Sequence, residues 1–294
     1  MRFVTFLHEG KARAGVIHQD SGDRLIDGGH PSRPAALQGL EPDMMAWIRF
    51  GLERLSHELS ATEIAPECLL PLSAVKLLAP LRNPGKIVGA AFNYKDGLVF
   101  GKREFPAEPV IFVKSMSTVI GPDDIIEIDT VNQVTYEAEL AVVIGRQALK
   151  VSRDDAMDYV SGYVIFNDVS TTNYVREDGG FVRGKNQPTS GPLGPWIRSC
   201  DDISDPYALA VTLDVDGRRL QDSNTSQMLY RIDELIEYAS ARMPLDLGDI
   251  IATGTPVGVA ANHEPPAWLM PGMRVSARLE GLGQLNNIVA KREL

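Results

Sequence analysis

Apolar and polar positions alternate over short runs along much of this chain, with the period of two that is typical of β-strands. Seven runs after residue 85, separated by Gly, Pro and Asp, predict strands at 86–91, 109–114, 137–145, 162–169, 209–217, 249–254 and 273–281. Shorter runs near the N-terminus predict a hairpin or meander at 2–7, 12–18 and 24–27. The pattern therefore indicates a β-rich chain.

Helical spacing of apolar residues is limited to a few segments. It predicts helices over 42–59, 153–160 and 226–241, the last with Thr225 or Ser226 as N-cap. The Pro-rich stretch 66–86 predicts a linker. We therefore expect an α+β chain with a small N-terminal α/β domain at 1–80 and a larger, β-rich domain at 81–294.

Composition describes an ordinary globular protein, with 44% apolar and 23% charged residues among 294. The net charge of −10 argues against nucleic acid or an anionic membrane as a partner. No apolar run approaches the ~20 residues of a membrane helix, and the first residues lack the apolar core of a signal peptide. Two distant cysteines, Cys68 and Cys200, indicate a reducing compartment, so we expect a cytoplasmic protein.

Glu137 and Glu139 stand at the head of a predicted strand whose next five residues, 140–144, are all apolar. Alternate residues of a strand share a face and lie roughly 7 Å apart. Burying two like charges there is costly unless a positive group lies between them, and a divalent cation suits carboxylate oxygens. The alternative is a strand with a solvated outer face that carries two ordinary surface glutamates.

A third carboxylate, Asp168, ends the next apolar run at 162–169. Three carboxylates would make an all-oxygen site suited to Mg²⁺ or Mn²⁺, with Ca²⁺ as an alternative. Zinc ordinarily takes His or Cys ligands, and none of the five histidines lies at ligand spacing from another. The sequence therefore disfavours a zinc site.

Three further segments carry polar groups in irregular settings. The segment 93–109 contains Asn93 and Tyr94 and has the length of a mobile loop or lid. Lys185 follows Gly184 just before a Pro- and Gly-rich turn. A strand runs into the loop 253–258, where Thr255 and backbone N–H groups either bind a carboxylate or simply form a tight turn.

Taken in order, these segments resemble the fumarylacetoacetate hydrolase family from about residue 86 to residue 294. The resemblance rests on GAAFNY, PVIFVKSMSTVIGP, YEAELAVVIG, GYVIFNDVS, GK, PLGPW, the DG…Q…T…M run from Asp216 to Met228, GDIIATGTPVG and LMPGMRV…EGLGQLNN. It implies a β-roll of mixed sheets that encloses a metal site, often preceded by a small N-terminal domain. It also implies a homodimer.

The resemblance assigns roles to residues that match the family pattern. Glu137, Glu139 and Asp168 correspond to its three metal ligands. Lys185 corresponds to a lysine near the metal that contacts bound substrate, and Thr255 to a threonine that holds a substrate carboxylate. Tyr94 corresponds to a residue at the pocket entrance, with a core aromatic as the alternative.

Two departures from the family pattern affect the expected chemistry. Gly97 and Phe100 stand where many members have the lid His and Glu that activate water or relay a proton. Thr172, Asn173 and Val175 replace Arg, Asp and Gln, so the substrate contacts of those groups are in doubt.

Other residues are candidates for the missing base and for substrate binding. Asp96, Glu104 and His263 are potential replacement bases, although a lone loop histidine is more often a surface residue. Lys102 and Arg103 lie where a lid cation would grip an anionic substrate.

The resemblance implies an enzyme that acts on a small anionic 2-oxo acid or 1,3-dicarbonyl acid through a metal-stabilised enolate. Hydrolysis of a C–C bond, as in an acylpyruvate, is the first expectation. An isomerase (tautomerase) or β-keto-acid decarboxylase of aromatic or sugar acid catabolism is the alternative, since neither reaction needs an activated water. A third hypothesis is a non-catalytic homologue that retains the metal site.

Overall fold

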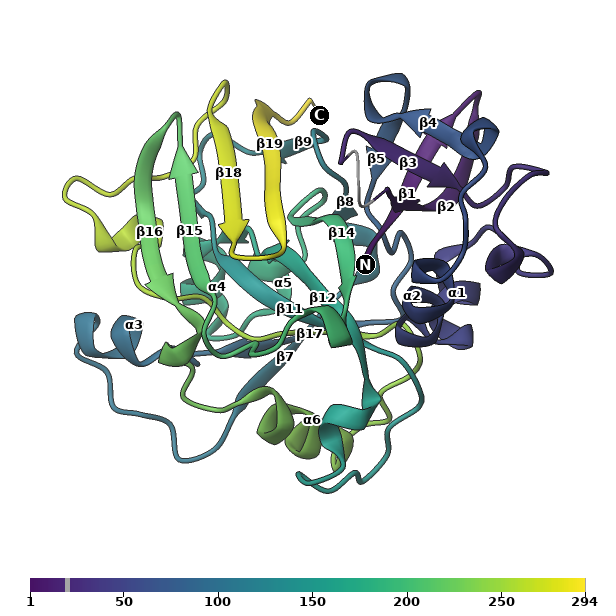
Figure 1. Cartoon of the computed structure of the whole chain (residues 1–294). Coiled ribbons are helices and arrows are strands. Elements are labelled where there is room, and N and C mark those ends of the chain that lie inside the picture. Colours follow the sequence, from purple (N-terminus) through teal and green to yellow (C-terminus); the bar gives the residue numbers. More distant parts are fainter. Residues whose placement is uncertain (19–21, 294) are drawn as a thin grey trace.

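A computed structural model describes residues 1–18 and 22–293 (Figure 1). Strands hold 36% of the residues and helices 23%, so the expected α+β, β-rich class is confirmed. Within the described residues the strands form one large sheet, a five-stranded sheet and a short two-stranded sheet. Parallel and antiparallel pairs both occur, which makes the sheets mixed.

The large sheet contains twelve strands in the described part of the chain. In spatial order its main path is β4 (Leu69–Pro71), β3 (Arg24–Asp27), β2 (Lys11–Ile17), β1 (Arg2–His8), β14 (Gly191–Ser199), β12 (Val160–Asn167), β11 (Ala138–Ile144), β17 (Ile250–Ala252), β6 (Ile87–Ala91) and β7 (Val110–Lys114). Off this path, β5 (Lys76–Leu78) pairs with β1, and β8 (Val119–Ile120) pairs with β14.

Two smaller sheets complete the fold. The five-stranded sheet has the order β16 (Arg218–Asn224), β15 (Ala210–Val215), β18 (Arg274–Leu279), β19 (Gly283–Lys291) and β9 (Ile125–Ile128). The pair is β10 (Val134–Thr135) with β13 (Ser170–Thr171). In Figure 1 the five-stranded sheet and the N-terminal strands occupy opposite sides of the view.

The helices are short: α1 (Met44–Phe50), α2 (Leu52–Ser60), α3 (Lys95–Phe100), α4 (Thr172–Asp178), α5 (Val182–Lys185) and α6 (Ile232–Ser240). The helix predicted over 42–59 is interrupted at Gly51, whose φ of +105° separates α1 from α2. The helix predicted over 153–160 is only a 3-10 turn at Ala156–Tyr159.

The helix predicted over 226–241 begins six residues late. Residues 225–227 form a separate 3-10 turn, and α6 starts after Arg231, whose N–H donates to the Glu234 carboxylate in a capping box. The intervening chain is held extended because the Leu229 N–H donates to the Asn93 carbonyl and Tyr94 forms a β-bridge with Met228. The predicted N-cap at Thr225 or Ser226 is therefore wrong.

Burial accounts for the apolar run in strand β11, because all seven residues of the strand are buried. One face, with Leu140 and Val142, packs into a core shared with α6 and the five-stranded sheet. The other face, with Ala141 and Val143, packs into a second core that includes α1 and α2. A strand sandwiched in this way has no solvated face.

The predicted linker at 66–86 is wrong, because β4 and β5 lie within it and pair with β3 and β1. The N-terminal strands are also continuous with the large sheet, since Phe3 of β1 pairs with Ile197 of β14. The boundary between residues 80 and 81 stays a prediction, but hydrogen bonds and a common core join the two sides.

The large sheet curls strongly around its concave side. Four strand-to-strand steps separate β12 from β7, which would place them about 19 Å apart in a flat sheet. Yet Lys114 at the end of β7 reaches Asp168, just past β12, with Nζ–Oδ1 at 2.7 Å. The roll thus brings two distant strand ends together. In the described residues no helix is long and apolar enough to span a membrane.

Candidate metal centre

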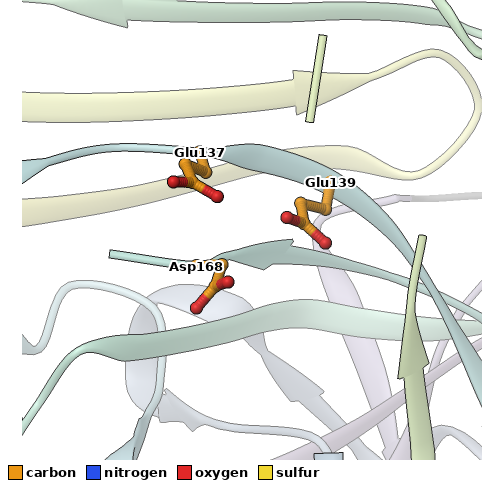
Figure 2. Close-up of side chains that lie close together, drawn as sticks. All are labelled: Glu137, Glu139 and Asp168. Carbon is orange, nitrogen blue, oxygen red and sulfur yellow. The ribbon is translucent and has the colours of Figure 1, made fainter. Parts of the chain in front are cut away.

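Glu137, Glu139 and Asp168 converge at one end of the curled sheet (Figure 2). Glu139 pairs with Phe166 across β11 and β12, and Glu137 and Asp168 each lie two residues from that pair. The period of two therefore puts all three on the same face. One carboxylate oxygen from each residue lies within 4.8 Å of the others.

The environment of these carboxylates fits a divalent cation. Burial, and then the charges of Asp168 and Glu137, raises the pKa of Glu139 well above its usual range. Burial also raises the pKa of Glu137, although Lys185 opposes this. A cation held by the three carboxylates would remove that repulsion, and an all-oxygen set suits Mg²⁺, Mn²⁺ or Ca²⁺.

Lys185 ends α5 and points its ammonium at two of the three carboxylates. Its Nζ lies 2.8 Å from Glu137 Oε2 and 2.6 Å from Asp168 Oδ2. Burial opposes its charge, but Asp168 and Glu137 outweigh this and raise the pKa of Lys185, so the group is a cation. Gly184 permits the approach, because a Cβ there would come within 2.3 Å of Val175 Cγ2.

Lys114 is a second buried lysine that sequence reasoning missed, and burial lowers its pKa although Asp168 opposes this. Its side chain is fully buried, and Nζ donates to Asp168 Oδ1 and to the carbonyls of Val169 and Ser190. Burial acts to raise the pKa of Asp168, but Lys114 and Lys185 together lower it. The sequence feature that could have identified Lys114 is its place at the end of the apolar run VIFVK.

The loop after β17 closes one side of the site. Gly254 N–H donates to Glu139 Oε2 at 3.0 Å. The Thr255 hydroxyl donates to the Ala138 carbonyl at 2.9 Å and accepts from Gln221 Nε2 at 2.9 Å. Gln221, a second residue that sequence reasoning missed, also accepts from the Ala138 N–H and so ties the loop to β11.

Tyr94 is buried, with 1% of its surface exposed, and does not line an open entrance. Its hydroxyl is buried and makes no hydrogen bond. Burial raises its pKa, and the charges of Glu139 and Asp96 add to the effect. This position agrees with the core-aromatic alternative.

The lid contains the short helix α3. Asp96 is held in place because its carboxylate accepts from the Gly97 N–H, the Val257 N–H and the Ser223 hydroxyl. Gly97 lies beside the same loop, where an added Cβ would come no closer than 3.5 Å to Val257 N. Phe100 is 55% exposed.

The other candidate bases and lid cations lie in different settings. Glu104 and Lys102 are exposed, and Arg103 places its guanidinium 4.9 Å from the Phe92 ring centre. His263 Nε2 is 2.9 Å from the Gly258 carbonyl. None of these contacts involves the three carboxylates.

All three residues that replace the family's Arg, Asp and Gln have structural contacts. Asn173 Oδ1 accepts from the Gln133 N–H, and its Nδ2 donates to Asn132. Val175 packs against Gly184, below Lys185. Thr172 begins α4, and its N–H donates to the Gln133 carbonyl.

Comparison with known proteins agrees with this geometry. Residues 86–290 match the family described as fumarylacetoacetate (FAA) hydrolase C-terminal. The chain is 36% identical to a mitochondrial oxaloacetate tautomerase of Xenopus laevis, covering 98% of this chain and 90% of that protein.

Solved structures are similar along the whole chain. A maleylpyruvate hydrolase from Sphingobium sp. SYK-6, in complex with manganese(II) and pyruvate, has a TM-score of 0.79 and 30% identity, with complete coverage of both chains. A 2-hydroxyhepta-2,4-diene-1,7-dioate isomerase from Mycobacterium marinum has a TM-score of 0.77 and 29% identity, again with complete coverage. The resemblance drawn from the motifs is thereby confirmed, and the chain belongs to the fumarylacetoacetate hydrolase family.

Proposed function

We propose that this protein is a divalent-metal-dependent tautomerase that interconverts the keto and enol forms of a small 2-oxo dicarboxylate. One observation carries the choice of reaction: the lid has Gly97 at the position of the family's base, and the neighbouring Asp96 is already bonded to three donors. Keto–enol exchange moves a proton between carbon and oxygen, so it needs a group that accepts and returns this proton but no activated water. The similarity to an oxaloacetate tautomerase supports this choice.

Glu137, Glu139 and Asp168 would hold the cation, with Mg²⁺ or Mn²⁺ preferred over Ca²⁺. When bound there, such an ion supplies Lewis-acid stabilisation of a developing enolate. Lys185 is a buried ammonium beside the same carboxylates, so we assign it the hydrogen bond to the substrate oxygen that gains charge. Lys114 offsets the charge of Asp168 and holds that ligand in position.

Thr255 and Tyr94 have supporting roles in this proposal. The Thr255 hydroxyl would need to exchange its bond to the Ala138 carbonyl in order to donate to a substrate carboxylate. Tyr94 is buried and Thr253 lies beside its hydroxyl, whereas Thr255 is partly exposed, so Thr255 is the more accessible donor of the two. We retain a cytoplasmic homodimer as the expected form.

Hydrolysis of a C–C bond, the first expectation from sequence, is the second candidate. The similarity to a maleylpyruvate hydrolase favours it. It would require a base other than a lid histidine. The Asp96 carboxylate and the His263 imidazole both already contact protein groups. Decarboxylation of a β-keto acid remains the third candidate, since it too needs no water.

The test is a parallel assay of the Mn²⁺-loaded protein with oxaloacetate and with acylpyruvates. We expect loss of the enol absorbance of oxaloacetate to be accelerated, without matching release of pyruvate. Pyruvate release from acylpyruvates at a higher kcat/KM would overturn the proposal in favour of hydrolysis. Release from oxaloacetate would indicate decarboxylation, and turnover of neither substrate a non-catalytic protein.

Two variants connect this test to the site. Glu139→Ala should abolish Mn²⁺ binding in calorimetry while the circular dichroism spectrum is retained, and normal binding would contradict the ligand assignment.

Gly97→His should add acylpyruvate hydrolysis, since a Cβ fits at this position, whereas the matched Gly97→Ala variant should not. Failure of Gly97→His to hydrolyse would remove the lid position as the determinant of reaction type.

A further inference from the structure

A cleft of about 900 Å³ lies away from the carboxylates, on the outer face of the five-stranded sheet. Ala210 and Thr212 of β15 and Arg278 of β18 lie on its floor, where they alternate with residues buried in the core. Thr212 and Arg278 are direct cross-strand partners and therefore share this face. Arg2 of β1 and Trp196 of β14 line the cleft from the large sheet.

The cleft is separate from the metal centre. Strand β14 joins the two regions: the Ser190 carbonyl, just before it, accepts from Lys114, while Arg198 lines the cleft. Eight residues of extended chain span roughly 26 Å. A ligand in the cleft would therefore not touch the three carboxylates. Figure 1 shows the N-terminus beside β14, at the junction of the two sheets.

Two of the arginines in the cleft have their charge balanced by protein groups. Arg198 pairs with Asp202 and also donates to the Gly281 carbonyl. Arg219 pairs with Asp214 and Asp222. Their guanidinium groups are therefore already paired with carboxylates of the protein.

Arg2 and Arg278 are different. Neither has a carboxylate within ion-pair distance among the described residues. Burial, and then the positive charge of Arg198, lowers the pKa of Arg2, although the Asp202 carboxylate opposes this. Arg2 and Arg278 therefore face one cleft without a direct ion pair, although the carboxylates of Asp202 and Glu280 also line it.

Trp196 supplies a third unsatisfied group. Its indole is packed between the Arg2 guanidinium, 5.3 Å from the ring centre, and Gly283, where a Cβ would come within 2.4 Å of the ring. Its Nε1–H is buried and has no acceptor. Buried N–H groups are ordinarily satisfied, so an acceptor is missing from this wall.

We propose that this cleft binds a small molecule with two or more oxyanion groups, carboxylate or phosphate, held by Arg2 and Arg278. Guanidinium groups match both oxyanions in geometry and charge. The volume lies within the range of small-molecule sites. Two separate guanidinium groups favour a polyanion over a single monovalent ion.

The test is calorimetry of the metal-free full-length chain at low ionic strength, with pyrophosphate and citrate as probes. We expect at least one probe to bind, and the stronger of the two identifies phosphate or carboxylate as the preferred group. Arg278→Gln and Trp196→Phe should each weaken binding, the former by about tenfold, because a charge-assisted hydrogen bond is lost. Arg54→Gln, at an exposed side chain of α2, is the matched control and should have no effect.

Binding must also be independent of the metal centre. Lys185→Met should leave the affinity unchanged, and a loss there would move the binding to the carboxylate site and overturn the proposal. Absence of binding by both probes would overturn it as well. So would unchanged affinity in both Arg278→Gln and Arg2→Gln.

Discussion

The two lysines at Asp168 occupy different carboxylate oxygens, Lys114 on Oδ1 and Lys185 on Oδ2. Lys114 has three protein acceptors, two of them backbone carbonyls that cannot move independently of the fold. The ammonium of Lys185 donates to carboxylates alone. We infer that Lys114 is a fixed structural charge and that Lys185 is the lysine able to change partners.

Lys114→Met should lower the free energy of unfolding by about 3 kcal/mol or more, because breaking a buried ion pair leaves an uncompensated charge. Urea denaturation of the metal-free protein measures this loss. Lys76→Met is the matched control: its pair with Asp124 is largely exposed, so the loss should stay below about 1 kcal/mol. Equal losses in the two variants would contradict a structural role for Lys114.

Sequence predicted the three carboxylates because each adjoins a run of apolar residues. Lys114 ends such a run too, but a lysine at a strand end is ordinarily solvated, and only the curl of the sheet brings it to Asp168. Gln221 belongs to the DG…Q…T…M run at 216–228 that contributes to the resemblance, but its role was not predicted, because its contacts to Ala138 and Thr255 join three segments far apart in the chain.

At the scale of elements, the loop that follows the short strand β17 contacts Glu139. Gly254 begins this loop with φ at +91°, and its N–H bonds the carboxylate. A Cβ there would come within 2.7 Å of the Ala90 carbonyl and 3.0 Å of Asn93 Cβ. The position therefore requires glycine both for its backbone angle and for space.

Gly254→Ala should destabilise the protein by about 3 kcal/mol, the sum of a left-handed backbone and overpacking. Gly217→Ala isolates the first contribution, because Gly217 also has a positive φ, +78°, but nothing lies within 4 Å of its Cβ position. Its cost should be about 1 kcal/mol. Thermal denaturation of both variants gives the comparison, and similar losses would argue against the crowding at Gly254.

Most strands were predicted because periodicity and burial agree in them. Strand β14 was taken for a rigid turn, since Gly191, Pro192, Gly194 and Pro195 are turn-forming residues, yet it lies in the middle of the large sheet. The helix starts were misplaced where tertiary contacts, such as Leu229 with Asn93, hold the chain extended.

The whole molecule is organised around two cores that lie on opposite faces of β11. Trp47 of α1 and Ile250 of β17 belong to the same core, although they come from the two predicted domains. Sequence patterns reveal strands but not which distant strands pair, so this continuity was not predictable. The shared core favours a single cooperative unit over two independent domains.

Native-state hydrogen exchange in increasing denaturant tests this cooperativity. Amides of α2 and of α6 should exchange with the same free energy, since global unfolding exposes both cores at once. A lower free energy for α2 alone would instead indicate an N-terminal domain that opens independently, with its boundary near residue 80.

The pairing of β1 with β14 has a consequence for biosynthesis. The amino group of Met1 bonds the Ser199 hydroxyl, a contact between residues 198 positions apart. Until β14 leaves the ribosome, the edge of β1 at Arg2 and Phe3 is unpaired, although β5 already pairs with residues 5–7, and unpaired strand edges favour aggregation. Such non-local pairing also slows folding. Nascent chains of this protein should therefore depend on chaperones over most of their synthesis.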